Sequence, residues 1–81
     1  MNNKNTLPYS DERLAKIMNI HPCEFKFLPI RKEIKQIVQE YNYSFDSKLA
    51  IQSLERLKGR YTNEVVISDA IDSLIFCIKL W

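Results

Sequence analysis

The chain contains only one glycine, Gly59, among its 81 residues. Glycine is the residue that adopts positive φ at no steric cost, so tight β-hairpins and glycine-rich phosphate loops have almost nothing to use here. No P-loop or dinucleotide-binding fingerprint is present either. The scarcity of glycine therefore argues against a hairpin-rich β protein and against a nucleotide-binding loop.

Groups for metal binding and acid–base chemistry are equally scarce. The chain has one histidine, His21, and two cysteines, Cys23 and Cys77, without the paired spacing of a zinc site. Residues two apart do not face each other on a helix, and Cys77 lies on an apolar helix face, so neither cysteine is placed to pair with His21. We expect His21 to cap a helix or to lie in solvent. The sequence predicts no enzyme activity, no metal, no cofactor and no small-molecule substrate.

Charge and hydrophobicity are those of an ordinary soluble domain. Twelve basic against ten acidic residues give a net charge of +2, which does not by itself indicate nucleic-acid binding. The polar residues 1–5 do not form a secretory signal, and the last apolar run contains Asp69, Asp72 and Lys79, which argues against a membrane span. We expect a cytoplasmic protein with two free thiols; a disulfide is the alternative.

Apolar spacing predicts an all-α fold, a small single-domain bundle of about four helices. The expected helices cover residues 10–18, 29–41, 46–58 and 63–80, with a possible short helical turn at 22–28. Residues 1–8 are expected to form a flexible N-terminal arm, and residues 9–81 a single helical domain.

Punctuating residues support these boundaries. Ser10 and Asp46 are good N-caps, and Asn19 suits the turn after a helix. Pro29 interrupts any helix that begins near residue 22, because it has no N–H to donate. The β-branched residues 65–67 could instead be extended, although no partner strand is evident.

Three apolar residues fall on otherwise polar helix faces. Phe76 and Leu80 lie in the polar arc of the last predicted helix, and Leu49 is similarly displaced on the third. An exposed phenylalanine beside a leucine is a common anchor of protein interfaces. The alternative is that the bundle wraps the last helix on two sides, so that Phe76 is simply core.

A second candidate site is basic. Arg31, Lys32 and Lys35 lie on the face of the second long helix that points away from its core side, and Lys26 lies just before them. Such a surface could bind nucleic acid or an acidic protein, or could merely solvate the helix. Residues 14–20 with the turn that follows resemble the first half of a helix-turn-helix, but Pro29 shortens the second helix to about seven residues.

These observations predict a non-catalytic regulatory or adaptor protein that binds another protein or forms a homo-oligomer. An inhibitor, an antitoxin-like antagonist or an accessory subunit would fit. A small nucleic-acid-binding module that uses the basic face is the alternative, and a subunit that completes an enzyme site only with another chain is a third possibility.

Overall fold

Five helices make up the part of the chain that the structure describes. The computed structural model describes residues 6–80, and these residues contain no strand. The helices are α1 (Asp11–Ile17), α2 (Pro22–Phe27), α3 (Arg31–Ser44), α4 (Ser47–Gly59) and α5 (Val65–Leu80). The predicted all-α bundle is confirmed. The possible turn at 22–28 is the helix α2, and the β-branched start of α5 is helical, not extended.

Side-chain caps fix where three of the helices begin. Ser10 and Asp46 each accept a hydrogen bond from the backbone N–H three residues further on, at 3.3 Å and 3.0 Å. His21 accepts through Nδ1 from the N–H of Cys23 at 3.1 Å. These bonds satisfy N–H groups that have no acceptor within the first turn of a helix. The predicted N-caps are therefore confirmed, and His21 is a helix cap.

The end of α1 is set by Asn19, whose φ of 60° is left-handed. Its N–H donates to the carbonyl of Lys16 at 3.2 Å, and the N–H of Ile20 donates to the carbonyl of Ala15 at 2.9 Å. This pair of bonds is a Schellman motif, in which asparagine is one of the few residues that take the left-handed position at low cost. The predicted helix stop at Asn19 is confirmed.

The single glycine is not used where its flexibility would suggest. Gly59 is the last residue of α4 and does not have a positive φ. The tight connection from α3 to α4 instead places Phe45 in the left-handed region, with φ 58°, and its N–H donates to the carbonyl of Tyr41 at 2.7 Å.

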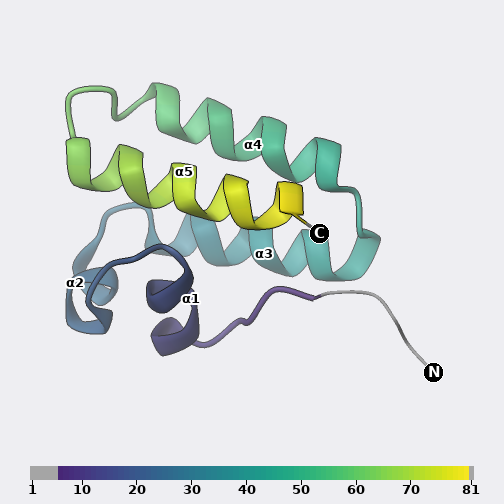
Figure 1. Cartoon of the computed structure of the whole chain (residues 1–81), viewed down its shortest axis with the longest axis horizontal. Helices are drawn as coiled ribbons and strands as arrows, with labels where there is room; N and C mark the ends of the chain where they lie inside the picture. Colours follow the sequence, from purple (N-terminus) through teal and green to yellow (C-terminus); the bar gives the residue numbers. More distant parts are fainter. Residues whose placement is uncertain (1–5, 81) are drawn as a thin grey trace.

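The helices pack in two groups (Figure 1). The antiparallel pair α4 and α5 lies side by side, and α3 packs against α4 behind them. The short helices α1 and α2 pack against each other, with α1 also on α5 and α2 on α3. The face of α5 that enters the core comprises Ile67, Ala70, Ile71, Leu74, Ile75 and Ile78. Because these residues cover only part of the helix circumference, the opposite side of α5 stays in solvent.

The chain is packed from Leu7 onward, two residues before the predicted start of the domain. Leu7 is only 2% exposed and belongs to the core. Its N–H donates to Oδ1 of Asn42 at 2.7 Å, and its carbonyl accepts from Nδ2 of Asn42 at 2.8 Å. One side chain of α3 thus satisfies both backbone groups of Leu7 and attaches the N-terminal segment to the bundle. Residues 1–5 of the predicted arm lie outside the described residues.

Candidate functional site

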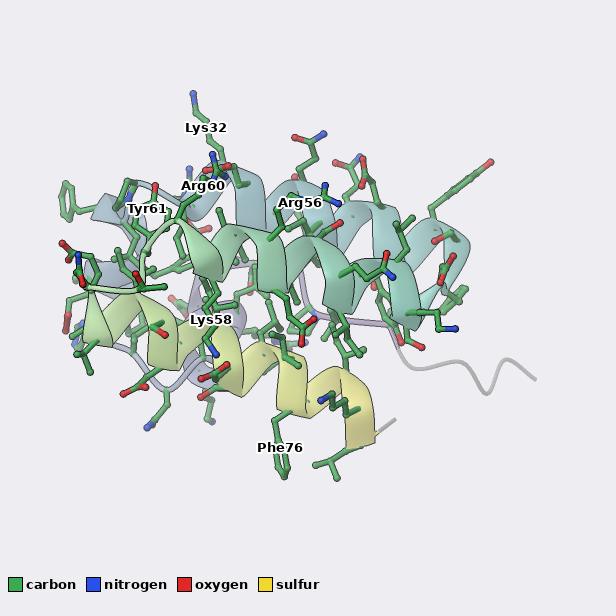
Figure 2. The ribbon with its side chains drawn as sticks, turned by 90° about the horizontal axis from the view of Figure 1, so that it is seen from above. Lys32, Arg56, Lys58, Arg60, Tyr61 and Phe76 are labelled. Atoms are coloured by element: carbon green, nitrogen blue, oxygen red, sulfur yellow. The ribbon has the colours of Figure 1, made fainter. Side chains whose placement is uncertain are left out.

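Phe76 and Leu80 are exposed on the outer side of α5. Their exposed fractions are 63% and 69%, although the same helix buries six other apolar side chains. Figure 2 shows the Phe76 ring projecting away from the bundle. The interpretation in which the bundle encloses Phe76 therefore does not hold. Because Leu80 follows four residues later, the two side chains are neighbours on one helix face.

Leu49 is also exposed, but it does not join Phe76 and Leu80. It lies two helical turns before Arg56 on α4, so the two share one side of that helix. In Figure 2, Arg56 is on the α3 side of the molecule and Phe76 projects from the opposite side. Leu49 accordingly lines a groove with residues of α3. The three predicted contact residues thus divide between two surfaces.

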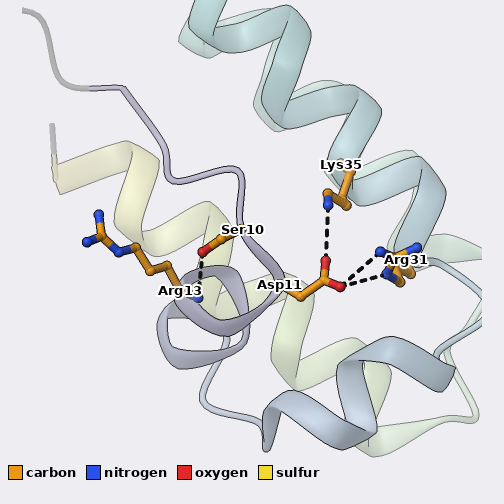
Figure 3. A network of polar contacts seen from close by, with 5 residues as sticks. All are labelled: Ser10, Asp11, Arg13, Arg31 and Lys35. Atoms are coloured by element: carbon orange, nitrogen blue, oxygen red, sulfur yellow. Dashed lines mark hydrogen bonds and ion pairs between the residues drawn. The ribbon is translucent and has the colours of Figure 1, made fainter.

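The basic face of α3 is partly neutralised by Asp11 (Figure 3). Oδ2 of Asp11 accepts from Nη2 of Arg31 at 2.9 Å and from its Nε at 3.2 Å, and Oδ1 accepts from Nζ of Lys35 at 3.1 Å. The ammonium group of Lys35 also lies 4.4 Å from the ring centre of Tyr9. The side chain of Arg13 points away from this carboxylate. Two of the predicted binding cations are therefore already engaged in joining α1 to α3.

The environment of Asp11 favours its charged form. The Arg31 hydrogen bond, supported by the hydrogen bond and charge of Lys35, lowers the pKa of Asp11 below its usual 3.8 despite the opposing effect of burial. The carboxylate is thus ionised throughout the neutral range. It competes there with any external anion for Arg31 and Lys35.

Lys32 and Lys26, the other two predicted basic residues, are exposed. No ion pair involves either of them among residues 6–80. Lys26 belongs to α2, which has only six residues and so is about 9 Å long. A helix of that length offers little surface to a DNA groove. The likeness to a helix-turn-helix is therefore limited to α1 and the turn that follows it.

A shallow groove of about 1030 Å³ lies on the outer side of α3. Its lining residues are Tyr9, Arg31, Lys32, Lys35, Gln36, Gln39, Glu40, Tyr43, Ser44 and Leu49. Tyr43 is 91% exposed and was not among the predicted site residues. Its place eleven residues after Lys32 could have revealed it, since that spacing puts both on one helix face.

The remaining candidate groups do not converge. His21 and Cys23 are exposed beside each other, while Cys77 is half-buried, and burial raises the pKa of its thiol. Among residues 6–80, no three His, Cys, Asp or Glu side chains lie close enough to hold a metal ion. Within the same range, no helix has both the length and the hydropathy needed to cross a bilayer.

Comparison with protein-family models, with curated proteins and with solved structures gives no match to this chain.

Proposed function

We propose that the chain is a non-catalytic helical regulatory or adaptor protein that binds another protein through Phe76 and Leu80. The observation that supports this proposal is the 63% exposure of Phe76 on a helix whose other side forms the core. Aromatic residues are enriched among those that dominate the binding energy of interfaces. Burying the exposed parts of Phe76 and Leu80 in an interface would contribute about 3 kcal/mol to the free energy of binding.

An inhibitor, an antitoxin-like antagonist or an accessory subunit of a cytoplasmic assembly would each use such a surface. All three roles require a folded domain whose docking residues are not needed for its own stability. Phe76 and Leu80 meet that requirement because both lie outside the core.

The test is affinity capture from lysate of the source cells with the wild-type chain and with the double variant Phe76→Asp/Leu80→Asp. We expect a protein that the wild type retains and the double variant loses, after which the purified pair should bind directly. Phe27→Asp is the matched control, since Phe27 is 86% exposed on α2, at the other end of the molecule from the C-terminus of α5 (Figure 1). Helical circular dichroism should be the same for all of them. Equal capture by all three chains would refute the proposal.

Nucleic-acid binding is a second candidate, favoured by the groove on α3. Exposed tyrosine rings and cations along one groove are the combination that holds single-stranded nucleic acid by stacking and by phosphate contacts. Because Asp11 competes for Arg31 and Lys35, Asp11→Asn should strengthen retention of a labelled single strand at low salt, and Lys32→Ala should weaken it. Absence of binding by all three chains would remove this candidate.

A further inference from the structure

We infer that the exposed surface formed by Phe76 and Leu80 binds a second copy of this chain. In this dimer the α5 helices of the two copies lie antiparallel, and the two-fold axis passes between the two Phe76 residues. The inference rests on the proposed function, since it names the occupant of the same surface. The evidence for a second copy is the arrangement of Asp72, Lys79 and Leu80 around Phe76.

Asp72 and Lys79 lie on the same side of Phe76 on the exposed stripe of α5, the stripe that Phe76 and Leu80 also belong to. They lie four residues before Phe76 and three residues after it, or about 6 Å and 4.5 Å along the helix axis. At about 100° per residue, both are rotated to the same side of Phe76, by roughly 40° and 60°. Leu80 is rotated by about 40° to the other side. The stripe therefore has an acid and a base on one flank, at nearly equal distances from a central phenyl ring.

Two-fold symmetry makes this flank complementary to itself. In an antiparallel pair of identical helices, each flank meets the same flank of the other copy, with the direction reversed. With the axis at Phe76, the ammonium group of Lys79 faces the carboxylate of Asp72 in the second copy, and the reciprocal pair forms as well. The two Phe76 rings meet at the centre, and Leu80 packs on the opposite flank. Among Asp72, Phe76, Lys79 and Leu80, the arrangement places no two like charges against each other.

The groups that this arrangement requires are available. Phe76, Lys79 and Leu80 are exposed, and the side chain of Asp72 is 51% exposed. Lys58 donates to Oδ1 of Asp72 at 2.7 Å, which leaves Oδ2 for a second donor. In Figure 2 no helix of residues 6–80 lies beyond the Phe76 ring, whereas Lys32 projects from the opposite side. The contact spans little more than two helical turns, so we expect a weak and reversible dimer rather than a permanent one.

The test is a charge exchange between two variants, followed by sedimentation equilibrium of the purified chain. Lys79→Glu places a carboxylate against Asp72 twice in the dimer, and Asp72→Lys places a cation against Lys79 twice. Each variant alone should self-associate at least roughly tenfold more weakly than the wild type, since two attractive pairs become repulsive. Mixed in equal amounts, the two variants restore both pairs and should associate about as tightly as the wild type.

Two controls separate this effect from misfolding and from net charge. Lys32→Glu makes the same charge change on the opposite side of the molecule and should leave self-association unchanged. Phe76→Asp removes the central contact without disturbing Lys58, and should abolish self-association even if Asp72→Lys does not fold. Circular dichroism and thermal melting establish that each variant is folded.

A wild-type chain that stays monomeric at the highest concentration it tolerates overturns the second-copy inference. So does a mixture of the two variants that gains no association over either alone. If that monomer still captures a different protein in a Phe76-dependent way, the proposed function stands and only the identity of the partner is wrong. If it captures nothing, both fail.

Discussion

Asp11 and Arg31 are twenty residues apart in the sequence, yet one carboxylate oxygen of Asp11 accepts both hydrogen bonds from the Arg31 side chain. The second oxygen remains for Lys35, so the charge of a single residue at the start of α1 is shared between two cations of α3. A basic face that looks accessible in the sequence is in this way converted into a structural contact between helices.

Asp11→Asn should lower the free energy of unfolding by about 1–2 kcal/mol at neutral pH, because the ion pairs weaken and Arg31 and Lys35 lose their charged acceptor. The pKa of Asp11 is depressed in the folded state, so its contribution is complete above the unfolded pKa and is lost as pH falls through the lower folded value. The stability difference from wild type should therefore be constant above about pH 5 and shrink in the acid range below about pH 4.

Chemical denaturation at a series of pH values measures this difference. Glu12→Gln, which removes an exposed carboxylate one residue further on, should change stability by less than about 0.5 kcal/mol. A difference for Asp11→Asn that persists unchanged into strong acid would show that the ion pairs are not its source.

Asn42→Ala should release the N-terminal segment. It removes two hydrogen bonds to the backbone of Leu7, each worth roughly 0.5–1.5 kcal/mol, so we expect the free energy of unfolding to fall by about 1–3 kcal/mol. The amide of Leu7 should also exchange with solvent faster. Gln39→Ala, an exposed position on the same helix, is the control and should leave that exchange rate unchanged.

Gly59→Ala should stabilise the chain by about 0.5–1 kcal/mol, because alanine has the higher helix propensity and restricts the unfolded state. A Cβ at this position meets no atom within 4 Å, and the backbone has no positive φ. Thermal and denaturant unfolding measure the change. A clear destabilisation would contradict the helical conformation of Gly59, whose φ is not positive.

Asn19, unlike Gly59, does take a left-handed conformation. Its φ of 60° suits asparagine and glycine, so Asn19→Gly should be neutral or slightly stabilising, whereas Asn19→Val should cost about 1–2 kcal/mol. Equal stabilities of the two variants, measured by denaturation, would contradict the left-handed turn after α1.

The local features of this fold could be predicted from the sequence because they depend on residues within one helical turn. The caps at Ser10 and Asp46 and the stop at Asn19 are of this kind. The helical spacing left two directions open for Phe76, and the structure shows that it is exposed. The left-handed positions among residues 6–80 are taken by Asn19 and Phe45 and not by Gly59.

Features that join distant segments could not be predicted in the same way. The hydrogen bonds between Leu7 and Asn42 link residues 35 apart, and the pairing of Asp11 with Lys35 links residues 24 apart. No periodicity specifies which helices meet. For the same reason, nothing in the sequence indicated that Leu49 faces α3 while Phe76 projects from the other side of the bundle.

Amide chemical-shift mapping of the isotope-labelled chain tests the docking surface most directly. The titrant is the captured protein or, for self-association, unlabelled chain. Chemical-shift changes should concentrate in the C-terminal half of α5, from Asp72 to Leu80, while the amide signals of α3 between Lys32 and Tyr43 should not change. Shifts confined to the α3 groove, with α5 unaffected, would contradict the account.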